Sequence, residues 1–267
     1  MLRACAFVLL VVGCGASGSS LRRSPTGLFE PRAYLEEVAA QQTDLLRAPE
    51  RSIEDLLAAR AASTGEARRG VLRDLARAHA ALARASEGRE ARRHREAAEG
   101  FAEQAGARDE RASLEMEFLL LWTAWANDVR GVGARAARFA RSHEDGGELL
   151  ALVWMMRGEL ALEASEWEEA RAAFRFILGS LGHPLYAYAL FRTGFAWHFA
   201  EDEPQSRQAL EEAAALGCPP AASATTVEVA VRAARLLGIG TRSEGDRTVP
   251  ASCAVERTSE DERPTPD

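Results

Sequence analysis

The chain has 267 residues, with 33 basic and 40 acidic side chains and a formal net charge of −7. A moderately acidic chain, with arginines scattered among its carboxylates, is not expected to bind nucleic acid. All 33 of these basic residues are arginines, and a chain without lysine cannot use Schiff-base, P-loop or kinase-type lysine chemistry.

Residues 1–13 have the pattern of an export signal. Arg3 precedes an apolar run of nine residues, from Ala4 to Val12, which is shorter than the roughly 20 residues that span a bilayer. The run ends in "VVGC", which resembles the lipobox of bacterial lipoproteins. The resemblance implies cleavage before Cys14, acyl chains carried by Cys14 and attachment to the membrane through this lipid anchor only. Gly15 stands where many inner-membrane lipoproteins have an acidic residue, which favours the outer membrane and a periplasm-facing protein.

This N-terminal region allows two other interpretations. Gly13, Gly15 and Gly18 have the G-x-G-x-x-G spacing of a dinucleotide-binding turn, but they lack the preceding strand and βαβ context that this motif requires. Cleavage before Cys14 would also remove Gly13. Ordinary secretion, with cleavage a few residues later, is the second alternative.

The composition divides the rest of the chain into three parts. Residues 14–30 contain Gly, Ser and Pro and are predicted to form a flexible tether. Residues 31–237 have apolar positions at every third and fourth residue, which predicts helices of roughly 12–18 residues arranged as antiparallel hairpins. Residues 238–267 are polar and charged, and are predicted to be a disordered tail. Helix breaks are predicted near Pro49, Gly65, Gly88, Gly106, Gly131, Gly146, Gly182, Pro204 and Pro219.

Two segments that start 36 residues apart, at Ala151 and Ala187, align with each other. They resemble the tetratricopeptide repeat, in which small residues let two helices approach closely. The resemblance implies an all-α fold, an α-solenoid of helix hairpins with clear repeats in 151–237 and degenerate repeats in 31–150; an irregular helical bundle is the alternative. It also implies that Gly158 meets Ala170. The residues expected to pack the repeats are Trp154, Gly158, Ala170, Phe174, Leu190, Gly194, Trp197 and Leu210.

A solenoid of helix pairs has a concave surface lined by the first helix of each pair. In the second unit the positions expected on this surface are unusually aromatic, as in grooves that bind peptides. Packing in the core is the alternative explanation for the same residues. The predicted partner-binding groove consists of Leu152, Met155, Glu159, Tyr188, Phe191, Phe195, His198 and Phe199.

Few other residues suggest chemistry. Cys218 and Cys253 are the two thiols left after lipidation and signal removal, and in an oxidising compartment they would form a disulfide or remain two separate thiols. The five histidines have no metal-ligand spacing, and the sequence has no C-x-x-C or G-x-S-x-G motif. We therefore predict no catalytic residue, no metal and no cofactor, and a protein that is not an enzyme.

These observations predict a lipid-anchored scaffold whose partners are envelope proteins or peptides. Lipoproteins of this type take part in outer-membrane, pilus or secretin, motility or cell-wall machinery. The alternative is a protein that binds cell-wall glycan, or another non-protein ligand, through the aromatic groove.

Overall fold

The computed structural model describes residues 31–106 and 110–253. The predicted signal peptide, the lipidation residue Cys14 and the tether at 14–30 lie outside these residues. The elements are α1 (Pro31–Gln42), the 3-10 turn η1 (Asp44–Leu46), α2 (Ile53–Ala62), α3 (Gly65–Ala85), α4 (Gly88–Ala105), α5 (Glu110–Ala126), α6 (Val132–Ser142), α7 (Gly147–Glu163), α8 (Trp167–Leu178), α9 (Tyr186–Phe199), α10 (Glu203–Ala215), α11 (Ala224–Leu236), β1 (Thr241–Glu244) and β2 (Arg247–Pro250). The helix breaks predicted from the sequence lie at or next to these helix boundaries.

Capping side chains mark the start of several helices. Ser52, Asp202 and Ser223 each accept a hydrogen bond from the backbone N–H three residues further on, at the start of α2, α10 and α11. Pro204 lies in the first turn of α10, where a missing N–H costs nothing because no helical carbonyl is available to pair with it.

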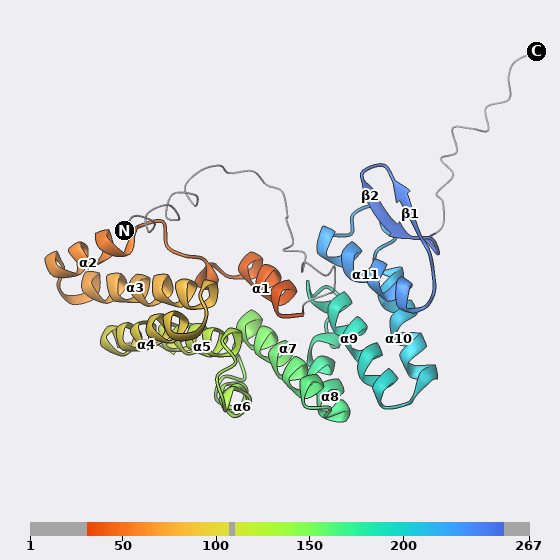
Figure 1. Ribbon diagram of the computed structural model, residues 1–267, viewed down its shortest axis with the longest axis horizontal. Coiled ribbons are helices and arrows are strands. Elements are labelled where there is room, and N and C mark those ends of the chain that lie inside the picture. The colour runs from red at the N-terminus through yellow and green to blue at the C-terminus, as the bar shows by residue number, and fades with distance from the viewer. Residues whose placement is uncertain (1–30, 107–109, 254–267) are drawn as a thin grey trace, which may run out of the picture.

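Neighbouring helices pack in pairs, and the pairs follow one another in a row (Figure 1). α3 packs on α4, α7 on α8 and α9 on α10, while α5 contacts both α3 and α7 and α9 contacts α11. The predicted α-solenoid of helix hairpins is therefore confirmed for the described residues. None of the helices in this part of the chain is long and apolar enough to cross a bilayer.

Four helices end in the same way, and this defines the repeat. After each helix one residue has a left-handed backbone, and the next residue donates its N–H to the carbonyl five positions back, as in a Schellman motif. These bonds are 2.8–3.0 Å long. The left-handed residues are Asp128, Ser165, Glu201 and Gly238, with φ of 53°, 62°, 60° and 72°, at intervals of 37, 36 and 37 residues. They follow α5, α7, α9 and α11, so α11 is the first helix of a unit in which a β-hairpin takes the place of the second helix.

The two aligned glycines allow the close helix approach that the repeat pattern predicts. A Cβ at Gly158 would lie 2.2 Å from the ring of Phe174, and a Cβ at Gly194 would lie 2.8 Å from the side chain of Leu210. The nearest atoms to this position on Gly158 belong to Phe174. Ala170 is fully buried one turn earlier on α8.

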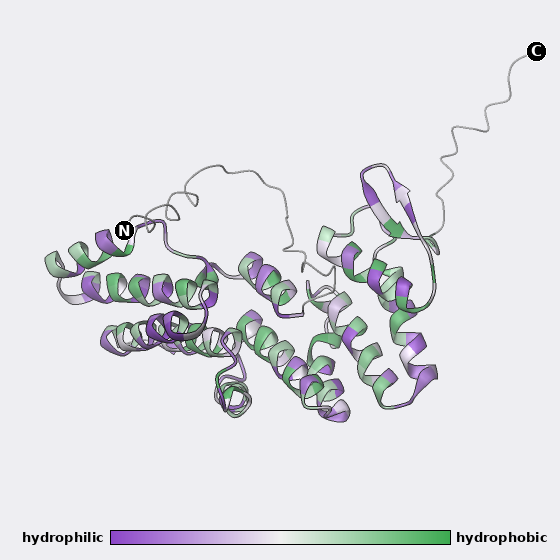
Figure 2. Cartoon of the chain, in the orientation of Figure 1, coloured by the Kyte–Doolittle hydropathy of each residue, from purple (hydrophilic) through white to green (hydrophobic). Residues whose placement is uncertain are grey.

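The hydropathy of the helices follows their place in the row. α3 and α4 mix hydrophilic and hydrophobic residues along their length, whereas α7 and α9 are mostly hydrophobic (Figure 2). A helix that is hydrophobic on most sides has to be covered on most sides. α8 covers one side of α7, and α10 covers one side of α9. The concave side of both helices has to be covered by another element.

The C-terminal region corrects the prediction of a disordered tail. Residues 241–250 form the antiparallel hairpin β1–β2, and Val249 and Cys253 pack against Val227 and Val231 of α11. The prediction from composition did not take into account that the few apolar residues of this region lie on one side of a hairpin. It also did not take into account that a disulfide holds them there. Residues 254–267 lie outside the described part.

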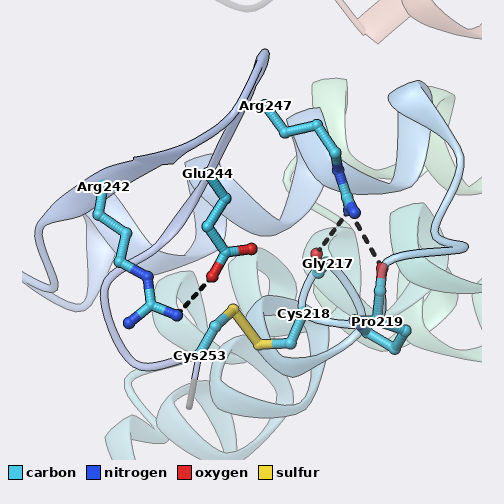
Figure 3. The surroundings of a disulfide bond; sticks show 7 residues. All are labelled: Gly217, Cys218, Pro219, Arg242, Glu244, Arg247 and Cys253. Carbon is cyan, nitrogen blue, oxygen red and sulfur yellow. Dashed lines mark hydrogen bonds and ion pairs between the residues drawn. A yellow bond between two sulfur atoms is a disulfide. The ribbon is translucent and has the colours of Figure 1, made fainter. Parts of the chain in front are cut away.

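A disulfide joins Cys218, in the loop after α10, to Cys253, just after β2 (Figure 3). The side chain of Arg247 adds a polar attachment, because it donates to the carbonyl oxygens of Gly217 at 3.2 Å and Pro219 at 3.1 Å. These carbonyls follow the end of α10, where the helix dipole favours a cation. Of the two alternatives for the cysteines, the structure has the disulfide.

Candidate functional site

The structure separates the eight predicted groove residues into two groups. Five are buried, so the prediction that they form an open groove is wrong for them; they are Leu152, Met155, Glu159, Tyr188 and Phe191, with at most 2% of their surface exposed. The other three lie near the end of α9: Phe195 is half-buried, while His198 and Phe199 are exposed.

The buried group is covered by the N-terminal helix α1. α1 crosses the concave side of the row above α7, between α3 and α9 (Figure 1). The ring of Tyr34 stacks on the ring of Tyr188, with centroids 4.6 Å apart and planes 13° apart. Leu35 is fully buried in the same core. The chain therefore fills most of its own predicted groove, which sequence periodicity could not reveal because α1 and α9 are far apart in the sequence.

Polar contacts fix the start of α1. Arg32 donates to both carboxylate oxygens of Glu163, at 3.0 and 3.1 Å, and to the carbonyl oxygen of Trp125 at 3.3 Å. It also pairs with Asp128. Asp128 and Glu163 lie at the ends of α5 and α7. The start of α1 therefore lies beside the α5–α6 and α7–α8 turns.

A buried ion pair joins α7 to α9 beneath α1. Arg192 donates to the two carboxylate oxygens of Glu159 at 2.8 and 2.6 Å, and the hydroxyl of Tyr188 donates to the first of them at 3.0 Å. Burial raises the pKa of the Tyr188 hydroxyl well above its usual value, and the Glu159 charge raises it further. The sequence prediction included Glu159 and Tyr188 but missed Arg192, although a single arginine in a mostly apolar helix was a usable signal.

An open aromatic surface remains where the α7–α8 and α9–α10 turns lie side by side. We call it the aromatic edge and define it as Trp167, Phe195, His198 and Phe199. Trp167 stacks on Phe199 with centroids 5.2 Å apart and planes 21° apart. Phe195 and His198 lie 6.1 and 5.4 Å from Phe199 between ring centroids. Phe199 is 52% exposed, so the stack leaves this aromatic side chain open to solvent.

Exposed carboxylates surround the aromatic edge. Glu166 and Glu168 flank Trp167 in the sequence, and Glu201 and Glu203 follow Phe199. The carboxylate of Glu203 lies 3.4 Å from Nδ1 of His198. The turn residue Glu201 has a left-handed backbone. The aromatic edge is thus an apolar patch within a negatively charged border.

The residues predicted to pack the repeats take two kinds of position. Six are buried, namely Gly158, Ala170, Phe174, Leu190, Gly194 and Leu210. The two tryptophans, Trp154 and Trp197, are half-buried and lie against guanidinium groups. Arg157 lies 4.1 Å from the Trp154 ring centroid, and Arg171 lies 3.8 Å from that of Trp197.

No cluster of three or more His, Cys, Asp or Glu side chains that could hold a metal ion occurs within residues 31–106 and 110–253. The most notable pair of titratable groups is His79 on α3 and His94 on α4, whose Nδ1 atoms are 3.0 Å apart. Burial lowers the pKa of His79, and the neighbouring His94 and Arg93 lower it further.

Comparisons of the chain with models of known protein families, with curated proteins and with solved structures found no significant match.

Proposed function

We propose that this chain is a lipid-anchored scaffold that faces the periplasm and binds protein partners of an envelope assembly through the aromatic edge. The observation that carries the proposal is the Trp167–Phe199 stack, in which Trp167 is half-buried and Phe199 is exposed, on a row of packed helices. Stacked aromatic side chains lose little conformational freedom on binding, which is why aromatic residues dominate the contacts that stabilise protein interfaces.

Two observations support the location. The "VVGC" sequence at residues 11–14 resembles a lipobox, and a Cys218–Cys253 disulfide is typical of a protein in an oxidising compartment. The contact of Arg32 with Glu163 also puts the start of α1 near the turn that carries Trp167. A membrane tether attached at the start of α1 would therefore join the folded part of the protein close to the aromatic edge.

Affinity capture from crosslinked cell envelopes tests this proposal. Tagged full-length protein is expected to capture a defined set of envelope proteins, and the Phe199→Ser variant is expected to lose them while keeping its melting temperature. Leu181→Ser is the matched control, because Leu181 is 82% exposed and lies in the loop between α8 and α9, outside the aromatic edge. Capture that is the same for wild type and Phe199→Ser would contradict the proposed surface.

The location has a separate test. Cys14→Ala removes the proposed acylation site, so this variant is expected to leave the membrane fraction and become soluble in the periplasm. If wild type and Cys14→Ala fractionate alike, the lipid anchor is wrong, whatever the capture experiment shows.

A glycan-binding role is the second candidate function, and one observation favours it. The Trp167 and Phe199 rings are close to parallel, and an exposed ring face is the kind of surface on which sugar rings stack. Sedimentation with purified peptidoglycan distinguishes the two functions. Binding to peptidoglycan that is lost in Phe199→Ser would favour the glycan, and absence of binding together with Phe199-dependent protein capture would favour the scaffold.

A further inference from the structure

Arginine side chains cover several aromatic rings of this protein, so the chain repeatedly uses cation–π contacts. The pairs, with the distance from the guanidinium carbon to the ring centroid, are Arg171 over Trp197 at 3.8 Å, Arg157 over Trp154 at 4.1 Å, Arg192 over Phe195 at 5.2 Å, Arg32 over Trp125 at 5.4 Å and Arg60 over Phe101 at 5.6 Å. Four of these rings lie on α5, α7 and α9, and one of them, Phe195, belongs to the aromatic edge itself.

The Trp167–Phe199 stack differs from these rings. No arginine in the described ranges lies over either ring, although Phe199 is the more exposed of the two phenylalanines that this surface presents from α9. The surface around the stack has negative charges instead. Glu166, Glu168 and Glu201 are exposed, and no ion pair within the described part of the chain involves them.

Three arginines, one each on α8, α9 and α10, already have partners. Arg192 is bound to the buried carboxylate of Glu159 at 2.6 Å, and Arg171 lies on Trp197. On α10, Arg207 lies 3.9 Å from Glu211. These contacts leave the Trp167–Phe199 stack without a cation from the described part of the chain.

We propose that the aromatic edge binds an arginine or lysine side chain from a basic segment of a partner protein. The cation lies over the exposed face of Phe199 beside Trp167, and the carboxylates of Glu166 and Glu201 compensate its charge. The same carboxylates repel phosphate groups, so the surface does not fit anionic headgroups or nucleic acid. This inference rests on the proposed function, because it names the chemistry of the partner for the same surface.

Binding of a defined peptide to the mature lipidated protein in detergent tests the proposal. The probe is a fluorescent twelve-residue peptide of alternating arginine and leucine, measured by fluorescence anisotropy. Its matched control has citrulline in place of arginine, which keeps the planar shape and removes the charge. We expect the arginine peptide to bind at least about tenfold more tightly than the citrulline peptide, and its affinity to fall as salt is raised.

Two variants assign the binding to this surface. Phe199→Ser removes the exposed ring, and Glu166→Gln combined with Glu201→Gln removes two charges while leaving the rings in place. Each is expected to reduce the affinity for the arginine peptide about tenfold. Glu90→Gln combined with Glu103→Gln, two exposed carboxylates of α4, is the matched control and is expected to bind as wild type does.

Each outcome decides the proposal. Equal binding of the two peptides, no binding, or equal losses in the α4 control and the Glu166/Glu201 variant would overturn it. If envelope capture depends on Phe199 while the peptides fail this test, the proposed function stands and the cationic partner is wrong. If envelope capture does not depend on Phe199, the proposed function itself fails.

Discussion

Tyr34 of α1 and Tyr188 of α9 stack face to face, with ring centroids 4.6 Å apart, although 154 positions separate them in the chain. This contact closes the concave side of the solenoid with the protein's own first helix. It explains why α7 and α9 are hydrophobic on most sides, and it moves the surface available to partners from the concave face to the aromatic edge.

Replacement of Tyr34 by alanine is expected to weaken the attachment of α1. Truncation of a buried aromatic side chain costs about 3 kcal/mol, because it leaves a cavity and removes the stacking contact. The measurement is the urea midpoint together with limited proteolysis of the linker between α1 and α2, which should become accessible before the rest unfolds. Tyr186→Ala, a truncation of a half-buried tyrosine at the start of α9, is the control. Equal loss in both variants would contradict a special role for the stack.

The sequence predicted the hairpins of this fold but not the element that covers them. Helix period, turn residues and the aligned glycines are local signals, and they located the helix breaks and the pair Gly158 and Gly194. The position of α1 depends on contacts between distant residues. A single sequence does not contain these contacts, so exposed and buried aromatic residues of α9 could not be told apart before the structure was known.

Substitution of the aligned glycines tests the close packing of the repeats. A Cβ at Gly158 would lie 2.2 Å from Phe174 and one at Gly194 would lie 2.8 Å from Leu210, so Gly158→Ala is expected to cost about 3 kcal/mol and Gly194→Ala about 1–2 kcal/mol. Gly70→Ala is the control. Gly70 lies in α3 with nothing within 4 Å of its Cβ position, and alanine there should stabilise the protein by about 0.5–1 kcal/mol. Thermal unfolding of the three variants gives the order of their stabilities. Destabilisation by Gly70→Ala would refute the packing explanation, because alanine at Gly70 meets no neighbouring atom.

The buried pair Glu159–Arg192 is expected to be sensitive to the loss of one charge. Glu159→Gln leaves the guanidinium of Arg192 buried without its counter-ion, which costs about 3–5 kcal/mol. The exposed pair Arg207–Glu211 provides the comparison, because Glu211→Gln should change the free energy of unfolding by less than about 0.5 kcal/mol. Equilibrium urea unfolding measures both. Similar small effects would show that water reaches the α7–α9 pair.

The disulfide should hold the β-hairpin on α11. The sequence did not predict that residues 241–250 fold, because their apolar side chains are few. Two cysteines in a sequence also do not establish a disulfide unless the fold is known to bring them together. Cys218 and Cys253 are 35 positions apart, so loop-closure entropy predicts a loss of about 3–4 kcal/mol in Cys253→Ser. Hydrogen exchange of residues 241–250 with and without reductant is the measurement. Unchanged protection after reduction would mean that Val249 and Arg247 suffice to keep the hairpin in place.

The His79–His94 pair predicts a dependence of stability on pH. Burial lowers the pKa of His79, with further lowering by His94 and Arg93, so the unfolded chain binds a proton on this residue more readily than the folded protein does. The contribution of His79 is therefore fully present above about pH 6.5, the pKa of an unperturbed histidine, and is lost progressively below it. Urea midpoints at pH 7.5 and 5.5 should differ more for wild type than for His79→Gln, which does not titrate. An equal loss of stability on acidification in wild type and His79→Gln would show that other groups cause it.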